Sequence, residues 1–117
     1  MQLSILTHII IIFSMIVHIT QAYTLTVELN FVAVCHLYVT DCNGKVLRNP
    51  GWKDCSNNRW FWYEAPDSIY CLHAYHRTNP HDNRYCSATN NACFSVRGNL
   101  MEGWDIYRCD EGNPCTS

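Results

Sequence analysis

Eight cysteines lie between residues 35 and 115 of this 117-residue chain, and no other feature limits its folding as strongly. An even number of cysteines in so short a chain is typical of a disulfide framework formed in an oxidising compartment rather than of a metal site. A domain of this size buries too little apolar surface to depend on its core alone. We therefore predict four disulfides, and their pairing stays open because eight cysteines allow about 105 combinations. The residues are Cys35, Cys42, Cys55, Cys71, Cys86, Cys93, Cys109 and Cys115.

The first 22 residues have the pattern of an export signal. Residues 9–17 (IIIIFSMIV) are apolar, but this run is too short to cross a bilayer core of about 30 Å as a helix. Thr20 and Ala22 are small residues of the kind that a signal peptidase reads. The lack of Lys and Arg before the run departs from the usual signal, and a membrane anchor is the competing interpretation. We predict a signal peptide over residues 1–22, a single mature domain over residues 23–117 and a secreted, extracellular protein, with uptake into host cells left open.

Alternating residues at the start of the mature chain predict a strand with one buried face. Apolar residues from Tyr23 to Phe31 take every second position, and the pattern slips at residues 32–34, which suggests a bulge or a strand buried on both faces. Residues 58–63, 69–75, 93–97 and 104–109 are also strand-like, whereas Asn43-Gly44 favours a tight hairpin turn. Residues 49–51, 77–83 and 87–91 have the composition of turns and loops. We predict a mainly β fold of five to seven short antiparallel strands, arranged as a small disulfide-rich sandwich or half-open barrel.

The charges exclude some partners. The net charge is −2 and the charged residues are interspersed, so neither nucleic acid nor an anionic membrane is an expected partner.

His73, His76 and His81 lie close together in the sequence, but His73 and His76 would lie on opposite faces of a strand, which is a poor arrangement for zinc. We predict no metal and no cofactor. If His76, His81 and Asp82 converge, they would form a pH-sensitive contact.

The aromatic run Trp60-Phe61-Trp62-Tyr63 is the most distinctive motif. On a strand, the two tryptophans would point to one side and Phe61 and Tyr63 to the other. A sheet with one exposed face would present one of these pairs to a protein partner or a sugar, whereas a strand packed on both faces would bury them all. We predict binding through Trp60, Trp62, Tyr63, Trp104 and Tyr107.

The segment Tyr63-Glu64-Ala65-Pro66 resembles the Tyr-Glu-x-Pro segment that carries the general base in small secreted guanyl-specific fungal ribonucleases. That resemblance implies Glu64 as a base and Arg84, about twenty residues later, as a partner, with a histidine such as His73, His76 or His81. The family's closing histidine is absent, because no histidine follows His81. The predicted protein is therefore not an enzyme.

A leader ending at Ala22, a short mature domain, eight cysteines and many Trp and Tyr residues make the chain similar to small secreted cysteine-rich proteins of filamentous fungi. Insect venom and plant defence proteins share much of this pattern. The resemblance to the fungal effector and toxin class implies a monomeric virulence protein that binds a host protein or a cell-surface glycan. The alternatives are a toxin, either ribonuclease-like or antimicrobial, and an inhibitor of a secreted host hydrolase that presents residues 77–83 as a rigid loop.

Overall fold

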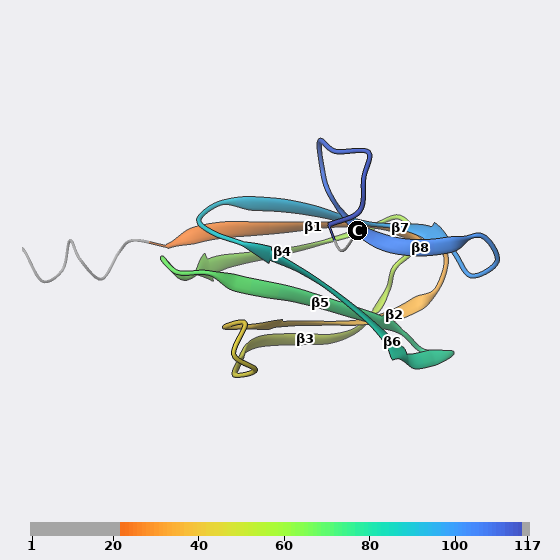
Figure 1. The fold of residues 1–117 in the computed structure, drawn as a ribbon, viewed down its shortest axis with the longest axis horizontal. Helices are drawn as coiled ribbons and strands as arrows, with labels where there is room; N and C mark the ends of the chain where they lie inside the picture. The colour runs from red at the N-terminus through yellow and green to blue at the C-terminus, as the bar shows by residue number, and fades with distance from the viewer. Residues whose placement is uncertain (1–21, 116–117) are drawn as a thin grey trace, which may run out of the picture.

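Two four-stranded sheets form the part of the chain that the structure, a computed structural model, describes, which is residues 22–115 (Figure 1). These residues contain no helix, and hence none that could span a membrane. The mainly β prediction is confirmed, and the architecture is the sandwich rather than the barrel. The predicted leader lies outside the described residues except for Ala22. The eight strands, one more than the upper end of the prediction, are β1 (Tyr23–Phe31), β2 (Val34–Thr40), β3 (Val46–Asp54), β4 (Asn58–Ala65), β5 (Tyr70–His76), β6 (Asn79–Ala88), β7 (Ala92–Asn99) and β8 (Gly103–Arg108).

The first sheet has the strand order β4-β1-β7-β8 and the second has the order β3-β2-β5-β6. Figure 1 shows them as two layers, with β1 and β7 in one and β2 and β3 in the other. All neighbouring strands are antiparallel except β1 and β7, which run parallel. This exception to the antiparallel prediction arises because the chain reaches β7 from β6 of the other sheet and not through a hairpin from β1.

The alternation at the start of the chain makes β1 a central strand of the core. Leu25, Val27, Leu29 and Phe31 are fully buried between the sheets, and each such side chain contributes about 1.5–3 kcal/mol through its burial. The slip at residues 32–34 is neither a bulge nor a doubly buried strand. Residues 32–33 form a bend with Val32 72% exposed, and the chain there leaves the first sheet for β2 of the second.

All eight cysteines are paired, as predicted, and the pairs are Cys35–Cys55, Cys42–Cys71, Cys86–Cys115 and Cys93–Cys109. The first two fix β2 and the loop after it to the ends of β3 and β5. The last two fix β7 and β6 to the segment that follows β8. Four disulfides indicate folding in an oxidising compartment.

Two predicted loops are edge strands instead. β3 runs through Asn49-Pro50-Gly51, where a register shift and a φ of +81° at Gly51 accommodate a proline that cannot donate to a neighbour. β6 begins at Asn79, so the predicted loop over residues 77–83 shrinks to a two-residue turn. The predicted tight turn at Asn43-Gly44 is instead a longer loop over residues 41–45. The positive φ angles are at Cys42 and Gly44, so Gly44 adopts one as expected and Asn43 does not.

Candidate functional site

Two of the five predicted binding residues lie in the core. Trp62 is 7% exposed and meets the ring of Tyr70 edge-on, with 6.0 Å between ring centroids. Trp104 is 6% exposed and stacks on Phe31 at 5.1 Å. Both side chains fill space between the sheets, because β4 and β8 turn these positions inward. Trp62 and Trp104 are therefore not available as contacts for a partner.

The other three predicted residues reach the surface to different degrees. Tyr63 is 66% exposed and stacks on Phe61 at 5.9 Å on the outer side of the first sheet. Trp60 points the other way and packs partly against the core. Tyr107 is half-buried, with the guanidinium of Arg97 4.7 Å from its ring centroid. The outward pair of β4 is thus Phe61 and Tyr63.

A larger group of rings covers the outer side of the second sheet. The inward positions of β2 and β5 are apolar, with Leu37 and Leu72 fully buried, and the residues between them point to the opposite side. The edge strands β3 and β6 add one ring each. We call this group the aromatic face, and its members are His36, Tyr38, Trp52, His73, Tyr75 and Tyr85.

The first row of the aromatic face crosses β3, β2 and β5. His36 is paired in register with both Trp52 and Tyr75. The His36 ring stacks on Tyr75 with 4.9 Å between centroids and an interplanar angle of 7°. Trp52 stands nearly perpendicular to both, at 5.0 Å from His36 and 5.6 Å from Tyr75. This row ends on the exposed edge strand β3.

The second row crosses β2, β5 and β6. Tyr38 stacks on His73 at 4.5 Å with an angle of 7°, and Tyr85 lies beyond His73 at 5.8 Å with a tilt of 32°. The rows touch where Tyr38 approaches Tyr75 at 6.4 Å. The six rings therefore form one continuous cluster over all four strands.

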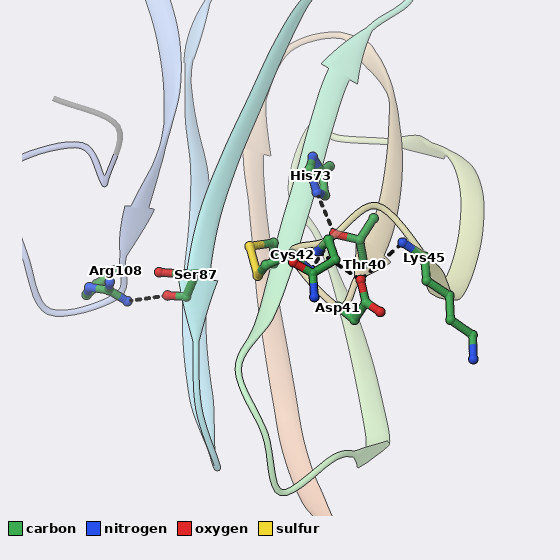
Figure 2. The surroundings of a disulfide bond; sticks show 9 residues. Thr40, Asp41, Cys42, Lys45, His73, Ser87 and Arg108 are labelled. Atoms are coloured by element: carbon green, nitrogen blue, oxygen red, sulfur yellow. Dashed lines mark hydrogen bonds between the residues drawn. A yellow bond between two sulfur atoms is a disulfide. The ribbon is translucent and has the colours of Figure 1, made fainter.

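Polar contacts hold the second row in place. The Nε2 atom of His73 lies 2.9 Å from the Oγ1 atom of Thr40, and the side-chain amide of Asn83 donates to the Tyr38 hydroxyl at 2.6 Å. Figure 2 shows His73 and Thr40 facing each other beside the disulfide of Cys42. Because that disulfide joins the loop over residues 41–45 to β5, the rings stand on a cross-linked backbone.

The aromatic face is uncharged at neutral pH. Burial lowers the pKa of His36 below its ordinary value near 6.5. Burial also lowers the pKa of His73, and a hydrogen bond with Asn83 opposes this effect. Protonation of His36 would in addition leave a buried Nδ1–H group without an acceptor, because that atom has no hydrogen-bond partner. Both imidazoles are therefore neutral at pH 7.

The residues implied by the ribonuclease resemblance are far apart in the fold. Glu64 is exposed on β4 of the first sheet, whereas Arg84 belongs to β6 of the second. The Arg84 guanidinium is already bound to the carboxylates of Asp82 and Asp105, at 2.8 Å each. The predicted separation of His73 and His76 is confirmed, with His73 on the outer side of β5 and His76 buried on the inner side.

A hollow of about 560 Å³ lies between the turn after β6 and the segment after β8. Its cation, Arg108, donates to the carbonyl of Ser87 (Figure 2) and lies 5.5 Å from the Phe94 ring centroid. Glu28 approaches the sulfurs of Cys93 and Cys109, but these are disulfide-bonded and offer a metal no thiolate. The cation of the hollow is therefore already engaged, and the disulfide beside Glu28 is no metal ligand.

The sequence carries a signal for the aromatic face that the five predicted binding residues do not include. His36-Leu37-Tyr38 and His73-Ala74-Tyr75 have the same spacing, with a small or aliphatic residue between two rings. This spacing places both rings of each strand on one side. Only the pairing of β2 with β5 brings the two motifs together, and the sequence does not give that pairing.

Comparison with known proteins gives no relative for this site. No family model, no curated protein and no solved structure matches the chain. The aromatic face must therefore be interpreted from its own chemistry. It is an uncharged surface of stacked rings, which is chemistry suited to binding.

Proposed function

We propose that this protein is a secreted, effector-like protein that acts by binding a host or competitor target, with the aromatic face as its contact surface. The observation that supports this is the continuous cluster of six rings on the outer side of the second sheet. Exposed apolar clusters of this kind are typical of interaction sites. Tyrosine and tryptophan provide rigid contact area with a polar tip, and the energy of an interface concentrates on such residues.

Secretion is supported by two independent features. The four disulfides fit an oxidising environment. The apolar residues 9–17, followed by small residues up to Ala22, fit an export signal. Mass spectrometry of the protein recovered from culture medium is expected to give Tyr23 as the first residue and eight oxidised cysteines. A chain that stays inside the cell with its first 22 residues attached would contradict the proposal.

Binding without turnover is the mode that the site favours. The groups implied by the ribonuclease resemblance, Glu64 and Arg84, belong to different sheets, and Arg84 is held by two carboxylates. The inhibitor alternative loses its long loop, because β6 begins at Asn79. Binding through the aromatic face requires neither a catalytic group nor a long loop.

The experiment compares surface binding by the oxidised protein, one double variant and one single variant. Fluorescently labelled protein is added to intact candidate host or competitor cells, and the bound fraction is measured. Trp52→Ala with Tyr85→Ala removes the two most exposed rings of the aromatic face and is expected to reduce binding about tenfold or more. Tyr63→Ala removes an even more exposed ring from the other sheet and is the control, expected to bind normally. Binding that depends on Tyr63 and not on Trp52 and Tyr85 would contradict the proposal.

A further inference from the structure

Two rings of the aromatic face, Trp52 and Tyr85, are more open to solvent than the other four. His36 and Tyr75 each cover one face of the other, and Tyr38 and His73 do the same in the second row. Trp52 is nearly perpendicular to its two neighbours, so neither lies flat against it. Tyr85 stands at the end of its row on the edge strand β6. Trp52 and Tyr85 are accordingly 51% and 57% exposed.

These two rings are too far apart for one small ligand. They lie on β3 and β6, the opposite edges of the second sheet, which are three strand spacings or about 14 Å apart. Their rows are also displaced by two residues along the strands, or about 7 Å. A molecule that reaches both must be long, and it must cross the strands diagonally over the stacked rings.

The groups between the two rings select an uncharged, hydroxylated ligand. Between the two rings, β2 and β5 present His36, Tyr38, His73 and Tyr75 on this side, and the two histidines are neutral at pH 7. Tyrosine hydroxyls and the Asn83 amide supply donors and acceptors along the path. The C–H bonds on the face of a sugar ring suit the negative face of an aromatic ring, and its hydroxyls suit these polar tips.

A protein partner fits this arrangement less well. Energetic hot spots of protein interfaces cluster near the centre of the contact, in pockets that exclude water. Here the centre consists of stacked rings that cover one another, and the open rings lie at the two edges. The hollows beside Arg108, Pro50 and Asn57 contain no ring of the aromatic face.

We infer that the aromatic face binds a neutral linear polysaccharide, with Trp52 and Tyr85 each stacking on a sugar ring and the chain running between them. This inference rests on the proposed function and names its ligand. Polar groups between the two stacking positions bind the hydroxyls of the intervening units. Because both stacking positions are needed at once, the ligand is a polymer or long oligomer and not a monosaccharide.

The test measures retention of the oxidised protein on neutral and charged polysaccharides. The neutral probes are cellulose, chitin and β-1,3-glucan, and polygalacturonate is the anionic control. Retention on at least one neutral probe is expected, with weak retention on polygalacturonate. Trp52→Ala and Tyr85→Ala are each expected to weaken the binding about tenfold, while Tyr63→Ala leaves it within about twofold.

Conservative variants separate stacking from folding. Tyr85→Phe keeps the ring and is expected to bind nearly as well as the natural protein. Trp52→Phe also keeps a ring and is expected to bind more strongly than Trp52→Ala. Near-ultraviolet circular dichroism checks that each variant is folded. Failure to bind any of the neutral probes, or binding that neither alanine variant weakens, would overturn the inference.

The cell-surface experiment distinguishes this inference from the proposed function. Cells are treated with glycosidases or with proteases before labelled protein is added. Loss of Trp52-dependent binding after glycosidase treatment alone supports the polysaccharide. Loss after protease treatment alone would overturn the polysaccharide and leave the binding function standing with a protein partner. Absence of any binding that depends on Trp52 or Tyr85 would overturn both.

Discussion

Gly98 is the position in β7 where a side chain is excluded most strongly. Its φ is +128°, and a Cβ atom there would lie 2.6 Å from the Cα of Trp104 and would also overlap the carbonyl oxygen of Gly103. Both obstacles are backbone atoms of β8 and cannot rotate away. We expect Gly98→Ala to lower the free energy of unfolding by about 3 kcal/mol or more, so that little folded protein is recovered.

The matched control for Gly98 is Gly112. It has open space around the Cβ position and no positive φ. Gly112→Ala should leave the Tm within about 2 °C of the natural value, as expected for a surface substitution. Thermal unfolding followed by circular dichroism measures both variants. An unchanged Tm for Gly98→Ala would mean that β7 and β8 can separate without loss of stability.

The histidines of the aromatic face predict a pH dependence of stability. Burial lowers the pKa of His36 and His73 in the folded state, so the unfolded chain binds protons more readily between that lowered pKa and about 6.5. Stability therefore rises with pH through this window and levels off above pH 7 or so. The aromatic rings beside these imidazoles, the Thr40 hydroxyl and the Asn83 amide carry no negative charge that would favour a cation.

We expect the Tm to fall by a few degrees when the pH is lowered from about 7.5 to 5. The double variant His36→Gln with His73→Gln should flatten this dependence, because it removes the groups whose protonation the fold disfavours. Exposed His81 is the control, and His81→Gln should keep the full dependence. Calorimetric melting at several pH values measures all three proteins. An equal slope in the double variant would assign the effect to other groups.

Single residues could be predicted only where one strand determines their environment. The inward positions of β1 were predicted correctly, because strict alternation fixes the side of a strand without knowledge of its neighbours. It could not distinguish Trp62, which is buried, from Tyr63, which is exposed, because both sides of β4 carry aromatic residues. Only the packing of one sheet on the other decides which side faces the core.

Among the elements, the central strands were predicted better than the edge strands. β1, β5 and β7 have almost no exposed positions and therefore clear apolar patterns. β3 and β6 are mainly exposed, and their Pro, Asn and Asp residues resemble a loop. Polar and proline-containing edges avoid unwanted pairing with other chains. Because the residues that suit β3 and β6 to an edge also resemble a loop, these two strands were not predicted. Trp52 and Tyr85, which they carry, were therefore not predicted as part of a binding surface.

Arg84 connects β6 to β8 across the two sheets. Its guanidinium binds Asp82 on its own strand and Asp105 on β8, each at 2.8 Å, and lies 5.3 Å from the centroid of the Trp104 ring. The Trp104 indole also donates to Asp82 at 3.1 Å. Because Arg84 and Asp82 are about one-third exposed, solvent weakens these contacts, and their loss costs about 1–2 kcal/mol rather than more.

Replacement of Arg84 by methionine should therefore lower the Tm by several degrees. Arg48→Gln is the control, because Arg48 is an exposed arginine of the opposite edge strand β3. Urea unfolding should show a lower midpoint for Arg84→Met with an unchanged slope. Equal midpoints for the two variants would show that the sheets are held by the core and the disulfides without help from this arginine.

At the scale of the whole molecule, the disulfides supply stability that a core this small does not. They close loops with sequence separations of 16 to 29 residues, and each is worth about 3–4 kcal/mol through restriction of the unfolded chain. Four such bonds together contribute about 12–16 kcal/mol, which is comparable with the 5–15 kcal/mol by which folded domains are usually stable. The fully reduced chain is therefore expected to be largely unfolded at room temperature.

Reduction with excess thiol at neutral pH should abolish the near-ultraviolet circular dichroism of the packed aromatic rings and expose Trp62 and Trp104, shifting tryptophan fluorescence to longer wavelength. The aromatic face should disappear in the same transition, because its rings belong to four strands that only the folded second sheet holds together. The double variant Cys86→Ala with Cys115→Ala is the partial case. It removes one cross-link to the terminal segment and should keep both sheets with a lower Tm. Native spectra from a sample that mass spectrometry shows to contain eight free thiols would mean that the core alone is sufficient, and that the cysteines serve some purpose other than stability.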